Sequence, residues 1–188
     1  MLRPAVPADA AALLAIYGQY IGTSITFEYT LPSPAEFRGR IEDISAVYPY
    51  LVYEKNGIPL GYAYAHRFAE RAAYQWSAEL SVYLDRDARG RGIGRKLYAA
   101  VMDLLRMQNV RTAYALVTTP NEPSDRFHLS LGFHVAGVTR NAGFKNGTWR
   151  SVTIYEKALA DYDSPPGPWT GWRALDPAAV AAVLKTYS

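Results

Sequence analysis

A glycine-rich turn with arginines carries the clearest chemistry in this sequence. It reads Arg89-Gly-Arg-Gly-Ile-Gly94, between a strand-like run that ends at Leu84 and a helix predicted over about residues 92–107. The first N–H groups of a helix lack intrahelical partners and carry partial positive charge. Glycine lets a phosphate approach the backbone, and arginine adds charge-assisted hydrogen bonds. The turn therefore predicts a pyrophosphate site.

Two common nucleotide-binding motifs do not fit this turn. The pattern Gly-x4-Gly-Lys-Ser/Thr is absent, and the pattern Gly-x-Gly-x-x-Gly fails because Arg95 stands where the third glycine belongs. The pattern that remains is Arg89-x-x-Gly92-x-Gly94. A purely structural turn with solvated arginines is the alternative interpretation of this segment.

A second candidate for chemistry is Glu79, in the strand-like run Glu79-Leu-Ser-Val-Tyr-Leu84. Strand alternation places Glu79, Ser81 and Tyr83 on one face. A carboxylate in an apolar strand is costly unless it is paired or used in a reaction. Either Glu79 serves acid–base chemistry, or it pairs with an arginine such as Arg71 for structural reasons.

The composition limits the class of protein. The chain has 188 residues, of which 49% are hydrophobic and 20% charged, and this predicts about one folded domain. It has no cysteine, which excludes disulfides, thiolate metal sites and a cysteine acyl-enzyme. No metal-binding spacing and no signal-peptide or membrane-spanning run is present, so we expect no metal and a cytoplasmic location.

The charge is concentrated in one place. The formal net charge is +3, and residues 85–96 contain five cations against Asp85 and Asp87, an excess of 5 − 2 = +3. The cations therefore gather at the glycine-rich turn and do not form the basic stripe that nucleic acid requires. We expect a local anion site and no nucleic-acid partner.

The predicted elements alternate between helices and strands. Helices are expected over residues 8–22, 34–46 and 92–107, with a short helix within 120–131. Strands are expected over residues 50–55, 60–67, 74–84, 112–118, 133–140 and 148–157, with turns at Asn56-Gly57 and Asn146-Gly147. This order predicts an α/β (mixed α+β) fold in which helices cover a mixed sheet.

The last part of the chain departs from this pattern. Residues 164–168 read Ser-Pro-Pro-Gly-Pro, and Asp176-Pro177 then predicts the start of a final helix. We expect a domain over residues 1–159 and an extension over 160–188. Its apolar stripe, which includes Val183 and Leu184, needs a surface to cover, either on this domain or on a second subunit.

The glycine-rich turn, placed between a strand and a helix, resembles the acetyl-CoA-binding motif of GNAT-superfamily N-acetyltransferases. Asn121-Glu-Pro-Ser124 with His128-Leu-Ser-Leu-Gly-Phe133 resembles the superfamily's next segment. The runs at residues 74–83 and 143–149 resemble the phosphinothricin N-acetyltransferase branch. The resemblance covers about residues 1–157, with its segments in the expected order.

This resemblance implies a GNAT-type fold, a central mixed and mostly antiparallel twisted sheet with helices on both faces. It also implies a homodimer that transfers the acetyl group of acetyl-CoA to the α-amino group of a small amino-acid-like acceptor, by direct attack in a ternary complex. Phosphinothricin, methionine sulfoximine and methionine sulfone are acceptors of this kind. No membrane partner and no metal is implied. The residues implied to bind acetyl-CoA are Val82, Tyr83, Leu84, Arg89, Gly90, Arg91, Gly92, Ile93, Gly94, Arg95, Asn121 and Ser124.

The resemblance also assigns roles in catalysis. Glu79 would take a proton from the attacking amine, and His128 would protonate the leaving thiolate. The two other histidines, His66 and His134, are expected to be structural. The residues implied to contact the acceptor are Phe27, Glu28, Tyr64, Arg71, Tyr74, Lys145 and Trp149, with Arg71 binding a carboxylate.

One departure bears on the acceptor. Glu28 stands where herbicide-detoxifying members carry an arginine, and Ala69 stands where they carry a basic residue. The site then has less positive charge, which makes another amino acid or amine as reasonable an acceptor as phosphinothricin. The alternatives are acetylation of a polyamine, an aminoglycoside or a peptide N-terminus, and a CoA-binding sensor without catalysis.

Overall fold

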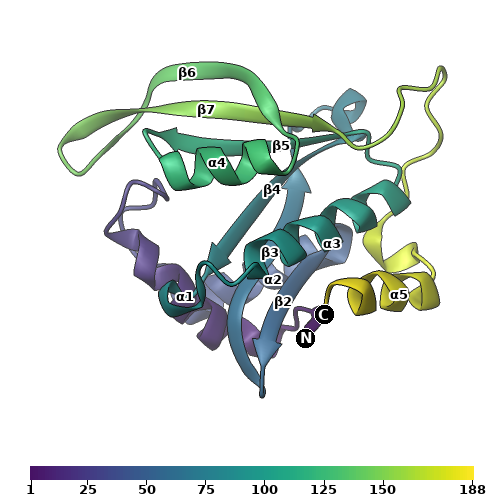
Figure 1. Ribbon diagram of the computed structural model, residues 1–188, viewed down its shortest axis with the longest axis horizontal. Helices are drawn as coiled ribbons and strands as arrows, with labels where there is room; N and C mark the ends of the chain where they lie inside the picture. The colour runs from purple at the N-terminus through teal and green to yellow at the C-terminus, as the bar shows by residue number, and fades with distance from the viewer.

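The computed structural model describes all residues, 1–188, and shows a seven-stranded sheet with helices on both faces (Figure 1). No helix combines the length and the apolar character needed to cross a membrane. The strands are β1 (Leu2–Pro4), β2 (Tyr50–Lys55), β3 (Ile58–Arg67), β4 (Ser77–Leu84), β5 (Thr112–Thr119), β6 (His134–Lys145) and β7 (Thr148–Ala158). The helices are α1 (Ala10–Ile21), α2 (Pro34–Val47), α3 (Ile93–Met107), α4 (Glu122–Ser130) and α5 (Pro177–Tyr187).

The sheet contains one parallel pair, and this pair opens a gap. The strand order is β1-β2-β3-β4-β5-β7-β6, and only β4 and β5 run parallel. They pair from Ser77 to Glu79 with Thr112 to Tyr114, and beyond these residues the two strands separate. The predicted mixed, mostly antiparallel sheet is therefore confirmed. The separation leaves each strand with one unpaired edge.

Each face of the sheet has its own hydrophobic core. The larger core lies under α3 and includes Leu97, Val101 and Leu104, which are fully buried. The smaller core lies under α1 and α2 and includes Leu13 and Ile41. Because neighbouring residues of a strand point to opposite faces, β4 sends Leu80 to the first core and Tyr83 toward the second.

Most of the predicted elements are present, and the exceptions have local causes. The Asn-Gly turns both occur, with positive φ at Asn56, Gly57, Asn146 and Gly147. The three-residue β1 was not predicted, since it is too short for a periodic signal. β4 begins only at Ser77, after a 3₁₀ turn. β6 continues beyond the predicted end at residue 140 to Lys145, through two irregularities in register, and the hairpin turn follows directly at Asn146-Gly147.

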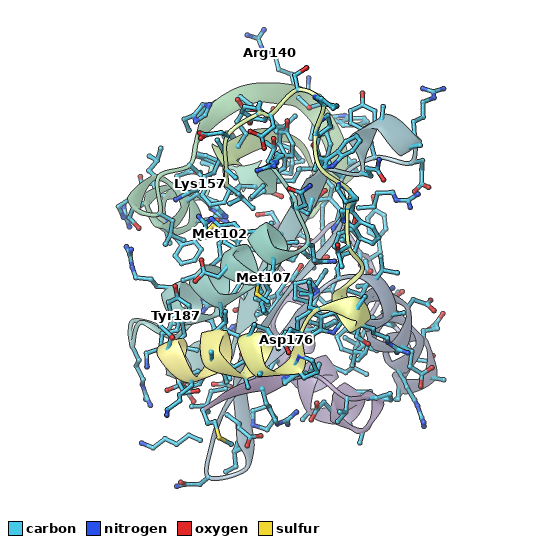
Figure 2. The ribbon with its side chains drawn as sticks, turned by 90° about the vertical axis from the view of Figure 1, so that its right-hand side faces the viewer. Met102, Met107, Arg140, Lys157, Asp176 and Tyr187 are labelled. Carbon is cyan, nitrogen blue, oxygen red and sulfur yellow. The ribbon has the colours of Figure 1, made fainter.

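The final helix packs on its own chain. Figure 2 shows α5 lying beside α3, with Asp176 at one end and Tyr187 at the other. The Asp176 carboxylate caps the helix by accepting from the N–H groups of Ala178 and Ala179. The Tyr187 hydroxyl donates to Asp103 of α3 at 2.6 Å. The apolar stripe of α5 therefore packs on α3 of the same chain and needs no second subunit to cover it.

Candidate active site

The gap between β4 and β5 is the centre of the candidate site. It forms an open pocket of about 80 Å³. Its walls come from residues 80–83 of β4 and 115–118 of β5, and Tyr98, Asn121, Ser124 and His128 close one side. Predicted cofactor-binding and catalytic residues from three separate segments thus line the same space. An extended ligand can lie here as an extra strand between two free strand edges.

The backbone edge of β4 is only partly available to such a ligand. Asp85 donates its N–H to the Leu60 carbonyl at 2.9 Å, so by alternation the backbone groups of Val82 and Leu84 point away from β3 and into the gap. The Tyr20 hydroxyl, however, donates to the Leu84 carbonyl at 2.6 Å and lies 3.2 Å from the Leu84 N–H. The backbone groups of Val82 are therefore free to pair with an extended ligand. Those of Leu84 are already bonded to Tyr20 of α1.

The glycine-rich turn forms an open cradle at the start of α3. Gly90 and Gly92 have φ of 74° and 76°, and an added Cβ at either would meet nothing within 4 Å. Gly92 is the N-cap of α3, and no side chain caps this end. The N–H groups of Ile93, Gly94 and Arg95 therefore lack intrahelical partners. This arrangement fits the pyrophosphate predicted from the sequence.

The arginines around the cradle differ in their contacts. Arg89 lies over the ring of Tyr20, with its guanidinium carbon 5.1 Å from the ring centre. Arg91 is exposed. The Arg95 guanidinium instead donates to the Ser130 hydroxyl at 2.8 Å, on α4. Arg95 therefore offers the cradle its backbone N–H, while its side chain ties α3 to α4.

His128 is buried in a hydrogen-bond chain, with 4% of its surface exposed. Its Nδ1 lies 2.8 Å from the Ser124 carbonyl and its Nε2 lies 3.1 Å from the Tyr98 hydroxyl. Burial lowers the pKa of His128, so the neutral ring is favoured. Since a carbonyl only accepts, Nδ1 carries the hydrogen and Nε2 can accept from Tyr98. The single hydrogen of the Tyr98 hydroxyl has two acceptors, each 3.1 Å away: His128 Nε2 and the Leu80 carbonyl at the gap.

Glu79 lies at the closed end of the gap. It belongs to the last residue pair between β4 and β5, and its face of β4 is the one that α1 covers. Its carboxylate is 19% exposed and lies 3.5 Å from Nε2 of His66. The alternative partner, Arg71, is exposed and makes no ion pair. His66 is therefore the group that accompanies Glu79.

The loop before α2 meets the end of the β6–β7 hairpin. Lys145 is 3% exposed, and its ammonium donates to the carbonyls of Thr26 and Glu28 at 2.6 Å each. The Phe27 ring packs on β6, where a Cβ on Gly143 would lie 2.6 Å from it. Lys145 therefore holds the loop in place, a role different from the expected contact with an acceptor.

An aromatic pocket beside Glu79 contains a paired arginine and carboxylate. The Arg40 guanidinium donates to Glu28 at 2.6 Å. The pocket has about 80 Å³, and its aromatic lining consists of Tyr17, Phe37, Tyr50, Tyr62 and Tyr64. Arg40 was missed because it stands in a helix of charged residues with no motif around it. Its charge compensates for the Glu28 that replaces the expected arginine.

The remaining residues expected to contact the acceptor lie further out. Arg71 and Tyr74 are exposed around a 3₁₀ turn, and Tyr74 packs edge-on against Phe68. Trp149 is 61% exposed, with its ring centre 5.5 Å from that of Phe144. No contact joins these residues to Glu79 or His128. No group of three His, Asp or Glu residues is placed to hold a metal.

Comparisons with known proteins agree with this geometry. The chain is 34% identical over 168 residues to the phosphinothricin N-acetyltransferase of Streptomyces viridochromogenes, covering 89% of this chain and 91% of that protein. It is 30% identical to the L-methionine sulfoximine/L-methionine sulfone acetyltransferase of Pseudomonas aeruginosa, covering 88% and 98%.

A solved structure and a family model extend the agreement. The structure of a phosphinothricin acetyltransferase from Sinorhizobium meliloti, in complex with acetyl-CoA, superposes with a TM-score of 0.83 at 32% identity. The superposition covers 94% of this chain and 95% of that one. Residues 2–164 match the acetyltransferase (GNAT) domain. The sequence match and the similar fold agree, and this chain belongs to the GNAT acetyltransferases.

Proposed function

We propose that the protein transfers the acetyl group of acetyl-CoA to the α-amino group of a small amino-acid-like acceptor, by direct attack in a ternary complex. The observation that carries the proposal is the position of Glu79. It stands where the gap between β4 and β5 closes, two residues from Ser81, which pairs with Tyr64 of the aromatic pocket that contains Glu28 and Arg40. The names of the relatives support the same class of acceptor.

The chain's own groups account for binding the donor. The backbone of Val82 pairs with the extended arm in the gap, and the N–H groups from Gly90 to Arg95 receive the pyrophosphate. Asn121 and Ser124 border the gap from α4. When bound, acetyl-CoA supplies an acetyl thioester. These contacts would place that thioester near the closed end of the gap.

Two groups manage the protons. Glu79 takes a proton from the acceptor's ammonium, because only a neutral amine can attack. The neutral His128 holds the Tyr98 hydroxyl at the wall of the gap, and this hydroxyl passes its proton to the leaving sulfur and regains one from the nitrogen that becomes the amide. The base, Glu79, lies at the closed end of the gap, and the acid, Tyr98, lies on its wall.

The acceptor's carboxylate binds Arg40 in this proposal, in place of Arg71. Arg40 lines the aromatic pocket, whereas Arg71 is exposed beyond it. Glu28 takes up one N–H group of Arg40, so the acceptor's carboxylate would bind the remaining N–H groups of the guanidinium while its ammonium faces Glu79. An α-amino acid carries an ammonium and a carboxylate on the same carbon atom, so it suits a site with both charges better than a polyamine does.

The assembly and setting follow as parts of the same proposal. β6 is an exposed edge strand with Val135 and Val138 each 51% exposed, and this supports a homodimer through the β6–β7 hairpin. The absence of cysteine supports a cytoplasmic location. Residues 160–188 would serve as an extension that braces α3 without entering the gap.

Thiol release from acetyl-CoA with a panel of amino acids and other amines tests the proposal. We expect turnover with phosphinothricin-like or methionine-derived amino acids, and a loss of about 10²-fold in kcat for Glu79→Gln. Glu156→Gln, in an exposed His–Glu pair on β7, is the control and should keep full activity. Turnover only with polyamines or peptides would contradict the acceptor class. Full activity of Glu79→Gln at every pH would contradict its role as base.

A further inference from the structure

His66 and Glu79 face each other across β3 and β4, and this pair carries a further role. We propose that His66 is a positioning residue that receives the amine's proton from Glu79 and passes it to solvent. The inference rests on the proposed function, because it concerns the proton that leaves the acceptor. It concerns a residue that no motif in the sequence singles out.

The geometry gives the ring one free nitrogen toward the carboxylate. His66 and Glu79 are direct partners in the antiparallel register, and His66 Nε2 lies 3.5 Å from Glu79 Oε1. On its other side, His66 Nδ1 lies 3.0 Å from the Arg67 carbonyl. Since that carbonyl can only accept, Nδ1 carries a hydrogen in the neutral ring. Nε2 is then the nitrogen that can take a proton from Glu79.

The ring also connects the carboxylate to solvent. The His66 side chain is 37% exposed, whereas Glu79 is 19% exposed. His66 lines an open depression of about 450 Å³ between the end of α2 and the end of β3. The titratable groups that border it are Asp43 of α2, Tyr48, Arg67 and Glu70. The proton thus has a path from Glu79 through the ring to this depression.

The charges around His66 favour such a path. Burial lowers the pKa of His66, but the contact and charge of Glu79 and the Arg67 carbonyl outweigh it, so this pKa lies above its ordinary value. The neighbour along β3 is Tyr64, whose ring centre is 6.0 Å away and which carries no charge at neutral pH. Glu79 is therefore the only charged group in contact with the ring nitrogen that faces it.

The reaction needs this exit, because the acceptor's ammonium loses two protons and the sulfur takes up only one of them. The C–N bond forms and the thioester C–S bond breaks, while the acceptor's ammonium loses two protons in becoming an amide. One of these protons ends on the sulfur. The other must reach solvent before the next turnover. Glu79 alone returns it slowly, because most of its surface is covered, whereas His66 opens onto water.

The test compares His66→Gln with a matched control. The control is His134→Gln. His134 is also an exposed histidine paired with a glutamate, since its Nε2 lies 2.9 Å from Glu156, but it stands on β6 and lines neither the gap nor the aromatic pocket. We expect kcat of His66→Gln to fall about tenfold at neutral pH, with the KM for acetyl-CoA unchanged. Added imidazole should restore much of this rate by entering the depression. The pH–rate profile should lose the ionisation of His66, and His134→Gln should behave as the wild type.

A second readout does not depend on turnover. NMR titration of the His66 ring should give a lower midpoint in Glu79→Gln than in the wild type, because the carboxylate that stabilises the cation is gone. An unchanged midpoint would overturn the proposal. A wild-type kcat in His66→Gln would also overturn it. So would a lower kcat that imidazole does not restore, if the Tm of the variant is lower too. A wild type that acetylates no amino acid would instead overturn the proposed function itself.

Discussion

The Lys145 ammonium, at the end of β6, donates to the carbonyl oxygen of Glu28 at 2.6 Å, across 117 positions of the chain. A second bond of 2.6 Å reaches the Thr26 carbonyl. One buried cation therefore fixes the loop that carries Phe27 and Glu28 against the β6–β7 hairpin. The shape of the proposed acceptor site depends on this link between two loops.

Lys145→Met should therefore weaken acceptor binding more than it weakens donor binding. It leaves two carbonyls without their partner, at a cost of about 1–3 kcal/mol in the free energy of unfolding. We expect a higher acceptor KM, an unchanged KM for acetyl-CoA and a lower Tm. Lys55→Met, at an exposed position of β2, is the control. An unchanged acceptor KM would show that the loop holds its shape without Lys145.

Gly92→Ala should weaken acetyl-CoA binding. A side chain at φ of 76° costs about 1–2 kcal/mol, and a methyl group there enters the space that the pyrophosphate would occupy. Gly57→Ala is a matched control, because Gly57 has the same φ of 76° and equally open surroundings in the β2–β3 turn. Calorimetry should show weaker acetyl-CoA binding for Gly92→Ala alone, although both variants lose stability. Equal affinities would remove the cradle from the proposed donor site.

Arg40→Gln should raise the acceptor KM by about tenfold or more, since a charge-assisted hydrogen bond contributes about 1.5–3 kcal/mol. Arg71→Gln should have a small effect, because Arg71 is exposed beyond the aromatic pocket. Arg38→Gln, which affects an exposed pair with Glu42 on the same helix, controls for the change in α2. Steady-state kinetics with one amino-acid acceptor decide the matter. A larger effect at Arg71 would return the carboxylate to that residue.

Tyr98→Phe should lower kcat by about tenfold and leave both KM values unchanged. The variant removes the hydroxyl that lies 3.1 Å from His128 Nε2 and borders the gap, while it keeps the buried ring. Tyr187→Phe, which breaks the bond to Asp103 on the outer side of α3, should keep its kcat. If Tyr98→Phe turns over normally, the leaving sulfur receives its proton from a group other than this hydroxyl.

The buried His128 should make stability depend on pH in one direction. Because burial lowers its pKa in the folded state, the folded protein favours the neutral ring and resists protonation. Its contribution to stability is present above the unfolded pKa of about 6.5 and is lost as pH falls through the lower folded value. The Tm difference between the wild type and His128→Gln should therefore narrow below pH 6.5. A constant difference would mean that the ring does not titrate between these limits.

The sequence predicted the elements that have a strong local signal. The periodic stripe of α3, the Asn-Gly turns and the cap at Asp176 all depend on neighbours within a few residues, and the structure has each of them. The glycine-rich turn was also identifiable, because backbone with positive φ favours glycine, which stands at both Gly90 and Gly92.

Contacts between distant segments could not be predicted in this way. The register that sets His66 opposite Glu79 depends on where β3 and β4 align, and no local pattern fixes that alignment. Arg40 and Tyr98 looked like ordinary helix residues, although they meet Glu28 and His128 in the fold. Lys145 has a sequence position that fits a substrate contact equally well, and only its burial shows that it braces a loop.

The short pairing of β4 with β5 also affects how the molecule unfolds. The sheet is two leaves, β1–β4 and β5–β7, whose shared seam runs only from Ser77 to Glu79 on the β4 side. In the free protein the smaller leaf can open at a lower cost than global unfolding. A ligand that bonds both strand edges lengthens the seam, and mass action favours the closed form. The core under α3 already joins the two leaves, and occupancy of the gap should couple them further, visible as a sharper calorimetric transition.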